Sequence, residues 1–200
     1  MKTWDFLLRR KVRNALVLCQ VFCCVTALAI AQEAEGEMVN DKKEGTWTYY
    51  FKDGKKSAVE HFKNGVLDGT VEYFYPNGVR QGLENWTNGV MQDSATYWHK
   101  NGKLDKKGRY EQGQYAGEWR HYHENGNPKR IVSYANGLPE GAFKEYHDSG
   151  TIMQEGFYRD GKEDGQWKFY GENGKLEFIG TYKEGKEVKM EKVKKVKGKS

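Results

Sequence analysis

A period of 24 residues, present six times, restricts the fold of this chain more than any other feature. Seventeen of the 24 glycines keep this register without an insertion or a deletion. Each repeat has three glycine positions, which are Gly45, Gly54 and Gly65 in the first copy, and Asp93 replaces the first of them in the third copy. Glycines at this density disfavour long helices, so we expect each repeat to form one small supersecondary unit.

Aromatic side chains follow the same register in three columns, which lie two, five and seventeen residues after the first glycine. Val71 and Ala95 replace the ring of the first column in two copies. Because residues of equal phase in stacked repeats lie side by side, we expect the three columns to form the core. The columns contain Trp47, Trp119, Phe143 and Trp167; then Tyr50, Phe74, Trp98, Tyr122, Tyr146 and Tyr170; and then Phe62, Trp86, Tyr110, Tyr134, Tyr158 and Tyr182.

Most of the second and third glycines follow Asn or Asp, as in Asn77-Gly78 and Asn64-Gly65. Such pairs favour positive φ at both central residues of a type I′ hairpin turn. The runs between the turns, such as residues 46–51, are rich in Tyr, Trp, Phe, Thr and Val, which favour strands. The sequence therefore predicts an all-β protein, an elongated antiparallel meander of about twelve strands made of six 24-residue hairpin repeats over residues 45–188.

The two ends of the chain differ from the repeats. Residues 1–31 combine a basic start, an apolar run and a small-residue pattern before Gln32, which predicts a signal peptide cleaved after Ala31, with a retained anchor as the alternative. Residues 32–44 are predicted to be a short N-terminal linker, and residues 189–200 a Lys-rich disordered tail. We therefore expect an exported protein of the periplasm, the cell envelope or the exterior.

The formal net charge of +5 belongs to these ends. Because residues 1–31 carry +4 and residues 189–200 carry +5, the residues between them carry −4. An acidic body does not favour binding of nucleic acid, and we expect no such partner. All three cysteines lie within residues 1–31, so the cleaved protein would have no thiol chemistry.

The sequence contains none of the familiar catalytic or phosphate-binding motifs, such as Gly-x-Ser-x-Gly, the P-loop or His-Glu-x-x-His. His99, His123 and His147 share one phase, but a spacing of about 10 Å is too wide for ligands of one zinc ion. His121 and His123 could form a two-ligand metal clip, or else a pair without metal on the surface. The acidic run of residues 160–165 fits a turn better than a calcium loop. We expect no enzyme activity, no cofactor and no metal.

One stretch resembles a known family. Residues 158–167, Tyr-Arg-Asp-Gly-Lys-Glu-Asp-Gly-Gln-Trp, with Tyr170 and Asn173-Gly174, are similar to a MORN repeat, in the longer bacterial variant found in proteins named YwqK-type antitoxins. The resemblance extends over residues 45–188 and implies a sheet of hairpins without catalytic residues. It implies protein or lipid binding or, for the bacterial variant, antitoxin activity. Asp93 and Ala95 depart from the pattern, so we expect the third repeat to be locally loose.

Together these features predict a non-catalytic exported repeat protein that acts as a protein-binding or scaffold module through an aromatic-rich sheet. One alternative is a toxin-neutralising antitoxin or immunity protein. Another is binding to a membrane or polysaccharide surface, for which the Lys-rich tail would contact anionic groups at about 1 kcal/mol per lysine. The sequence does not say which face of the sheet binds.

Overall fold

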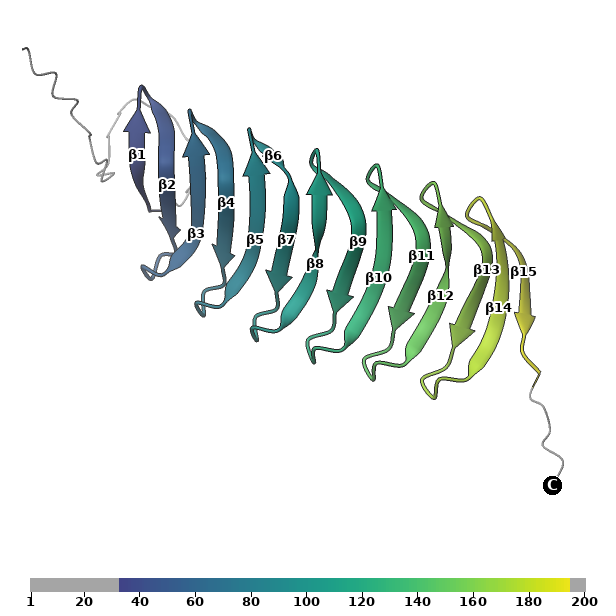
Figure 1. Ribbon diagram of the computed structural model, residues 1–200. Helices are drawn as coiled ribbons and strands as arrows, with labels where there is room; N and C mark the ends of the chain where they lie inside the picture. The colour runs from purple at the N-terminus through teal and green to yellow at the C-terminus, as the bar shows by residue number, and fades with distance from the viewer. Residues whose placement is uncertain (1–32, 195–200) are drawn as a thin grey trace, which may run out of the picture. The chain divides into compact units, whose positions relative to one another are not determined.

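The computed structural model describes residues 33–194 of the chain, and all regular elements in this range are β-strands (Figure 1). The strands pair antiparallel with their neighbours in sequence. The predicted all-β antiparallel meander of hairpin repeats is therefore confirmed. Residues 33–194 contain no helix with the length and hydropathy needed to span a membrane. The predicted signal peptide, residues 1–31, lies outside the described residues.

The chain divides between Val90 and Met91 into two compact units, and the short strand β6 (Val90–Met91) spans this division. In each unit the strands lie side by side in sequence order (Figure 1). The first unit contains β1 (Ala34–Val39), β2 (Lys42–Tyr50), β3 (Lys56–Lys63), β4 (Val66–Phe74) and β5 (Arg80–Thr87). The second contains β7 (Asp93–Trp98), β8 (Leu104–Glu111), β9 (Gln114–Tyr122), β10 (Pro128–Ala135), β11 (Leu138–Tyr146), β12 (Ile152–Arg159), β13 (Lys162–Tyr170), β14 (Leu176–Lys183) and β15 (Lys186–Lys192).

Strands extend beyond the predicted repeats at both ends, and one predicted strand is divided into β6 and β7, so residues 33–194 contain fifteen strands rather than about twelve. Residues 32–44, predicted to be a linker, instead contain β1 and the start of β2, joined by a turn in which Asn40 and Asp41 have φ of 48° and 59°. β1 completes the hydrogen bonding of β2, which would otherwise expose a row of unpaired amides. Residues 189–192, predicted to be disordered, belong to β15, which is exposed along its whole length.

The third glycine of each repeat forms the tight turn that the sequence predicts. Asn64 and Gly65 have φ of 52° and 84°, and the corresponding pairs in the other repeats are similar. These turns are also bonded to the preceding repeat: the Asn64 amide donates to the Glu44 carboxylate (2.7 Å), and the Gly65 amide donates to the Lys43 carbonyl (2.8 Å). In the later repeats, Asp160 donates in the same way to Glu140 (2.8 Å). Each tight turn therefore links two consecutive repeats.

The second glycine of each repeat forms a different turn, so the type I′ prediction is wrong there. Gly78 has φ of 84°, while Asn77 does not have a positive φ. The Gly78 amide donates to the Tyr75 carbonyl (2.8 Å), as in a type I turn followed by a left-handed glycine. The Asn77 side chain accepts a hydrogen bond from the Val79 amide (3.1 Å). Asparagine is favoured here because its side chain caps the loop.

The buried core follows the first aromatic column on one face of the sheet. In the first unit it includes Trp47 and Val71, and in the second unit Ala95, Trp119, Val132, Phe143 and Trp167. The third column packs against these side chains: Tyr110 lies edge-on to Trp119 (5.1 Å between centroids), and Tyr158 lies edge-on to Trp167 (5.1 Å). We call this side of the sheet the ring face, in each unit separately.

The second aromatic column does not join that core, contrary to the prediction that all three columns would form it. The Tyr50 hydroxyl donates to Glu35 (3.0 Å), and the Tyr170 hydroxyl donates to Glu155 (2.8 Å). Gly156 packs against Trp167 and therefore lies on the ring face. The neighbouring Glu155 points to the reverse face, because successive side chains in a strand point to opposite faces. Column two therefore lies on the reverse face, where Tyr50 and Tyr170 are hydrogen-bonded to carboxylates.

The ring of each buried tryptophan packs against a glycine eleven residues earlier, on the other strand of the same tight-turn hairpin. Gly36 packs against the ring of Trp47, and Gly108 and Gly156 pack in the same way against Trp119 and Trp167. Where the buried residue is smaller the glycine is replaced: Glu60 pairs with Val71, and Val132 with Phe143. Glycine at this position therefore provides the space for an indole.

Candidate binding face

The ring face of the second unit carries a row of side chains beside the core. The strand pairings place Tyr97 opposite Lys106, Lys106 opposite His121, and His121 opposite Arg130. The row continues through the pairs Arg130–Glu145, Glu145–Gln154, Gln154–Phe169 and Phe169–Phe178. All of these side chains are partly exposed. The repeat fold therefore aligns side chains of different chemistry across eight strands.

Three neighbouring members of this row, Lys106, His121 and Arg130, form what we call the basic row. The Lys106 ammonium lies 4.4 Å from the ring centroid of Tyr97 and 5.8 Å from that of Trp119. Such contacts stabilise a cation by about 0.5–2 kcal/mol and keep it close to the sheet. Lys106 therefore covers Trp119, which is completely buried, and presents its charge at a fixed place.

His121 lies between the two cations. Burial, and after it the positive charges of Arg130 and Lys106, lower the pKa of its imidazole to about 4. Asp105 opposes these effects, and Lys129 adds weakly to them. The ring of His121 therefore stays neutral at neutral pH, and its protonation reports on the charge of the basic row.

Arg130 has an unused donor. Within residues 33–194, its Nε atom is buried and has no hydrogen-bond acceptor. Glu145 lies opposite Arg130 on β11, but one of its carboxylate oxygens accepts a hydrogen bond from Gln154 (2.6 Å). A buried donor without an acceptor is costly, by about 1–3 kcal/mol. Arg130 as a whole is partly exposed, so its positive charge can still act on an anionic group at the surface.

In the first unit the same columns contain smaller side chains. Ala58 and Gly82 stand where the second unit has Lys106 and Arg130. A hollow of 340 Å³ lies there, and the residues lining it include Tyr49 and Tyr73. Burial raises the pKa of Tyr73 to about 12, and the charges of Glu84 and Glu60 contribute, so its hydroxyl is neutral at neutral pH. The first unit therefore offers an aromatic surface that also carries charge, because the Lys43 ammonium lies 4.7 Å from the ring centroid of Trp47 and Glu60 lines the hollow.

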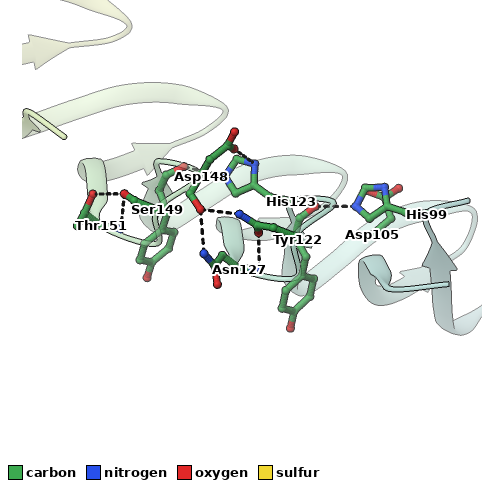
Figure 2. Close-up of polar contacts among 10 residues, drawn as sticks. His99, Asp105, Tyr122, His123, Asn127, Asp148, Ser149 and Thr151 are labelled. Atoms are coloured by element: carbon green, nitrogen blue, oxygen red, sulfur yellow. Dashed lines mark hydrogen bonds and ion pairs between the residues drawn. The ribbon is translucent and has the colours of Figure 1, made fainter. Parts of the chain in front are cut away.

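The phased histidines lie at the loops of the second glycine and bind the next repeat (Figure 2). His99 donates from Nε2 to the carbonyl of Tyr122 (3.0 Å), and His123 donates in the same way to Tyr146 (3.0 Å). The Nδ1 atom of His123 lies 2.6 Å from a carboxylate oxygen of Asp148. Since both ring nitrogens of His123 are engaged, the structure does not form the metal clip with His121 that the sequence left open. Residues 33–194 contain no group of three or more His, Cys, Asp or Glu that could hold a metal ion.

The predicted aromatic columns make up only part of the ring face, and the basic row lies outside them. Columns one and three form the buried base of the ring face, while column two belongs to the reverse face. Tyr97, Tyr115 and Phe169, which lie outside these columns, also pack against the core. Sequence reasoning missed Lys106 and Arg130 as members of the candidate binding face, because their column changes from repeat to repeat and carries no periodic signal. Only the pairing register brings them together.

The third repeat differs from the others at Asp93 and Ala95, the two positions that depart from the repeat pattern, and its predicted looseness stays a prediction. Asp93 replaces a glycine but adopts the same left-handed conformation, with φ of 63°. The strand is interrupted at Gln92, between β6 and β7. Ala95 occupies the place of the missing ring and is buried.

Comparison with known proteins identifies the repeat. The chain matches the family model described as the MORN repeat variant over residues 43–64, 67–91, 116–136, 139–160 and 163–184, which together cover more than half of it. A search of curated proteins found no match. Among solved structures, the crystal structure of a GtfA/B complex bound to UDP and GlcNAc is similar at 12% identity, with a TM-score of 0.27. The similarity covers 70% of this chain and 26% of that chain, so this chain spans about a quarter of the solved one.

Proposed function

Because the chain belongs to the MORN repeat variant family, we propose that it is a non-catalytic, exported protein-binding module whose contact surface is the ring face. The observation that carries the proposal is the continuous row from Tyr97 to Phe178, in which aromatic, basic, acidic and amide side chains alternate on one face of the second unit. Protein interfaces are enriched in aromatic residues and arginine, and a broad sheet face fits a protein partner.

A non-catalytic role is supported by the way in which the histidines are used. His99, His123 and His147 donate to backbone carbonyls of the following repeat, at 3.0, 3.0 and 3.3 Å. Histidine is the most frequent general base in enzymes, so these three side chains would be the first candidates for that role. We expect a change of one histidine to weaken the loops rather than to remove a turnover.

Export is supported by the sequence of residues 1–31, which has the layout of a signal peptide. We expect the protein from expressing cells to begin at Gln32 and to fractionate with the periplasm or the medium. N-terminal sequencing after cell fractionation measures both. A full-length protein in the cytoplasm would contradict this part of the proposal.

A second candidate is contact with an anionic membrane surface through β15. This strand carries Lys189 and Lys192, and Val188 and Met190 are 66% and 40% exposed. Lysines beside exposed apolar side chains suit a negatively charged lipid surface. Flotation with phosphatidylserine vesicles should then fail for the double variant Lys189→Gln/Lys192→Gln.

Affinity capture with the full-length chain tests the leading proposal, in envelope and cytoplasmic extracts and at low and high salt. The captured protein is then purified and its binding is measured directly. We expect Gln154→Arg, on the ring face, to weaken binding at least tenfold. Gln166→Arg is the matched control, because Gln166 neighbours the buried Trp167 and therefore points to the reverse face.

The outcomes of this experiment separate the candidates. Equal loss in both variants, or loss in Gln166→Arg alone, would contradict use of the ring face. Capture of lipid without protein would favour the membrane candidate. If the captured protein is a toxin whose activity the chain suppresses, the module acts as an antitoxin.

A further inference from the structure

We propose that the basic row, Lys106, His121 and Arg130, is a recognition site for an acidic segment of a protein partner, whose carboxylates pair with Lys106 and Arg130. This inference rests on the proposed protein-binding function and names the chemistry of the partner. It is independent of the predicted ring columns, because none of the three residues belongs to them.

The spacing of the two cations fits an extended chain. Lys106 on β8 and Arg130 on β10 lie opposite the same residue of β9, so their backbones are two strand spacings apart, about 10 Å. In an extended peptide, side chains two residues apart lie on the same side and are about 7 Å apart. Two acidic residues at this separation can reach both cations, since lysine and arginine have long side chains.

The state of the two cations favours an anionic ligand. Lys106 is held over the rings of Tyr97 and Trp119, so little conformational freedom remains to be lost on binding. Arg130 as a whole is partly exposed, so a carboxylate at the surface can pair with the outer nitrogens of its guanidinium through charge-assisted hydrogen bonds.

The surroundings favour a protein carboxylate over other anions. Glu145 follows Arg130 in the row, and residues 32–188 carry a net charge of −4, which would repel a long polyphosphate. A sugar ring needs an open aromatic face, but Lys106 lies over the ring of Tyr97. A short acidic segment needs only two matching positions, and apolar residues beside them can contact the rings that border the row.

The test uses the full-length chain and a fluorescein-labelled peptide of ten glutamates, with a peptide of ten glutamines as the reference. Anisotropy measures the affinity for each. We expect the glutamate peptide to bind, and the double variant Lys106→Met/Arg130→Met to bind it about ten- to a hundredfold more weakly. The matched control is Lys107→Met/Arg120→Met, which removes the same charges from adjacent positions of β8 and β9 that point to the reverse face. We expect less than a twofold change for this control.

A second measurement follows the imidazole of His121 by NMR. The two cations lower its pKa, so a bound carboxylate that neutralises them should raise it, and non-specific binding elsewhere should leave it unchanged. Absence of peptide binding, an equal loss in the control variant, or an unmoved His121 titration would each overturn the proposal. Binding of phosphatidylserine vesicles that depends on the basic row, without binding of the peptide, would overturn it in favour of a lipid headgroup.

The two proposals can fail separately. If a captured protein partner binds the Lys106→Met/Arg130→Met variant as tightly as the native chain but loses affinity for Gln154→Arg, the ring face is a protein-binding surface and the basic row is not its acidic-segment site. If both variants bind unchanged, the protein-binding function of the ring face fails as well. Circular dichroism confirms that each variant is folded.

Discussion

The pairing of glycine with tryptophan in each hairpin makes a quantitative test of the core possible. In Gly156→Val, the new Cβ would lie 2.6 Å from Cγ of Trp167, whereas carbon atoms in contact are normally about 3.5–4.0 Å apart. The indole cannot withdraw, because Tyr158, Phe143 and Tyr182 surround it at centroid distances of 5.1, 5.3 and 6.0 Å. Overpacking of this kind costs about 1–3 kcal/mol, and we expect about 3 kcal/mol here.

The second change, Trp167→Phe, removes part of a side chain that is 3% exposed and should cost about 2 kcal/mol of stability. If the two effects were independent, the double variant would lose about 5 kcal/mol. The preceding repeat, however, holds valine and phenylalanine at these two places, Val132 and Phe143, and buries both. We therefore expect the double variant to lose only about 2 kcal/mol, which is a coupling of about 3 kcal/mol.

Urea unfolding followed by far-ultraviolet circular dichroism measures the four proteins of this cycle. Gly165→Ala serves as a control for backbone effects, because that glycine has φ of 74° and nothing within 4 Å of an added Cβ. It should cost about 1–2 kcal/mol whatever residue stands at position 167. Losses that simply add in Gly156→Val/Trp167→Phe would refute the argument that glycine is needed to make room for the indole.

Three further outcomes are expected. The unfolding free energy should be highest above pH 6.5 and should fall by about 1 kcal/mol between pH 6.5 and 4, because the unfolded chain protonates His121 in this window more readily than the folded chain, while solvent screening of the partly exposed ring reduces the effect. His121→Phe should flatten this part of the profile, and an unchanged slope would contradict the prediction. Glu140→Ala should cost about 1 kcal/mol, since the Asp160 amide loses its acceptor at 2.8 Å, and hydrogen exchange at that amide should rise while Glu140→Gln keeps it slow. Asn125→Asp keeps the acceptor within its own loop but loses the bond from Nδ2 to the carbonyl of Asp148 (2.7 Å), so thermal unfolding should show a loss smaller than that of Asn125→Ala. No loss in Asn125→Asp would mean that the link between repeats is unimportant, and equal losses would mean that the acceptor within the loop is unimportant.

The sequence predicts the strands well because glycine and the rings repeat without a gap, and turns fix where strands begin and end. It does not reveal β1, because this segment has no glycine at the three repeat positions and keeps only Gly36, which has the same phase as Gly108 and Gly156. Its turn uses Asn40 and Asp41 in place of an Asn-Gly pair. It also misreads the loops of the second glycine, since Asn-Gly fits two turns, and only the loop length decides whether asparagine takes a positive φ or caps with its side chain.

The basic row could not be predicted for a different reason. Lys106 and Arg130 belong to a column that contains Ala58, Gly82 and Gln154 in other repeats, so no periodic pattern marks it. Which residues lie opposite one another also depends on β-bulges, which shift the pairing of β8 with β9 and of β9 with β10. The positions that stay constant between repeats therefore indicate the fold, whereas the candidate recognition residues lie at positions that vary between repeats.

The bonds between consecutive turns have a consequence for how such a chain can change its length. The same kind of contact recurs along the chain, from Asn64 to Glu44 and from Asp160 to Glu140, always twenty residues apart. A copy with an acceptor side chain at this position, such as Glu44 or Glu140, therefore offers an attachment to the next turn, whereas Ala116 at the same position has no acceptor. Gene duplication or loss in whole steps of 24 residues would preserve every such joint, so copy number can drift during evolution while the variable columns are free to acquire new partners.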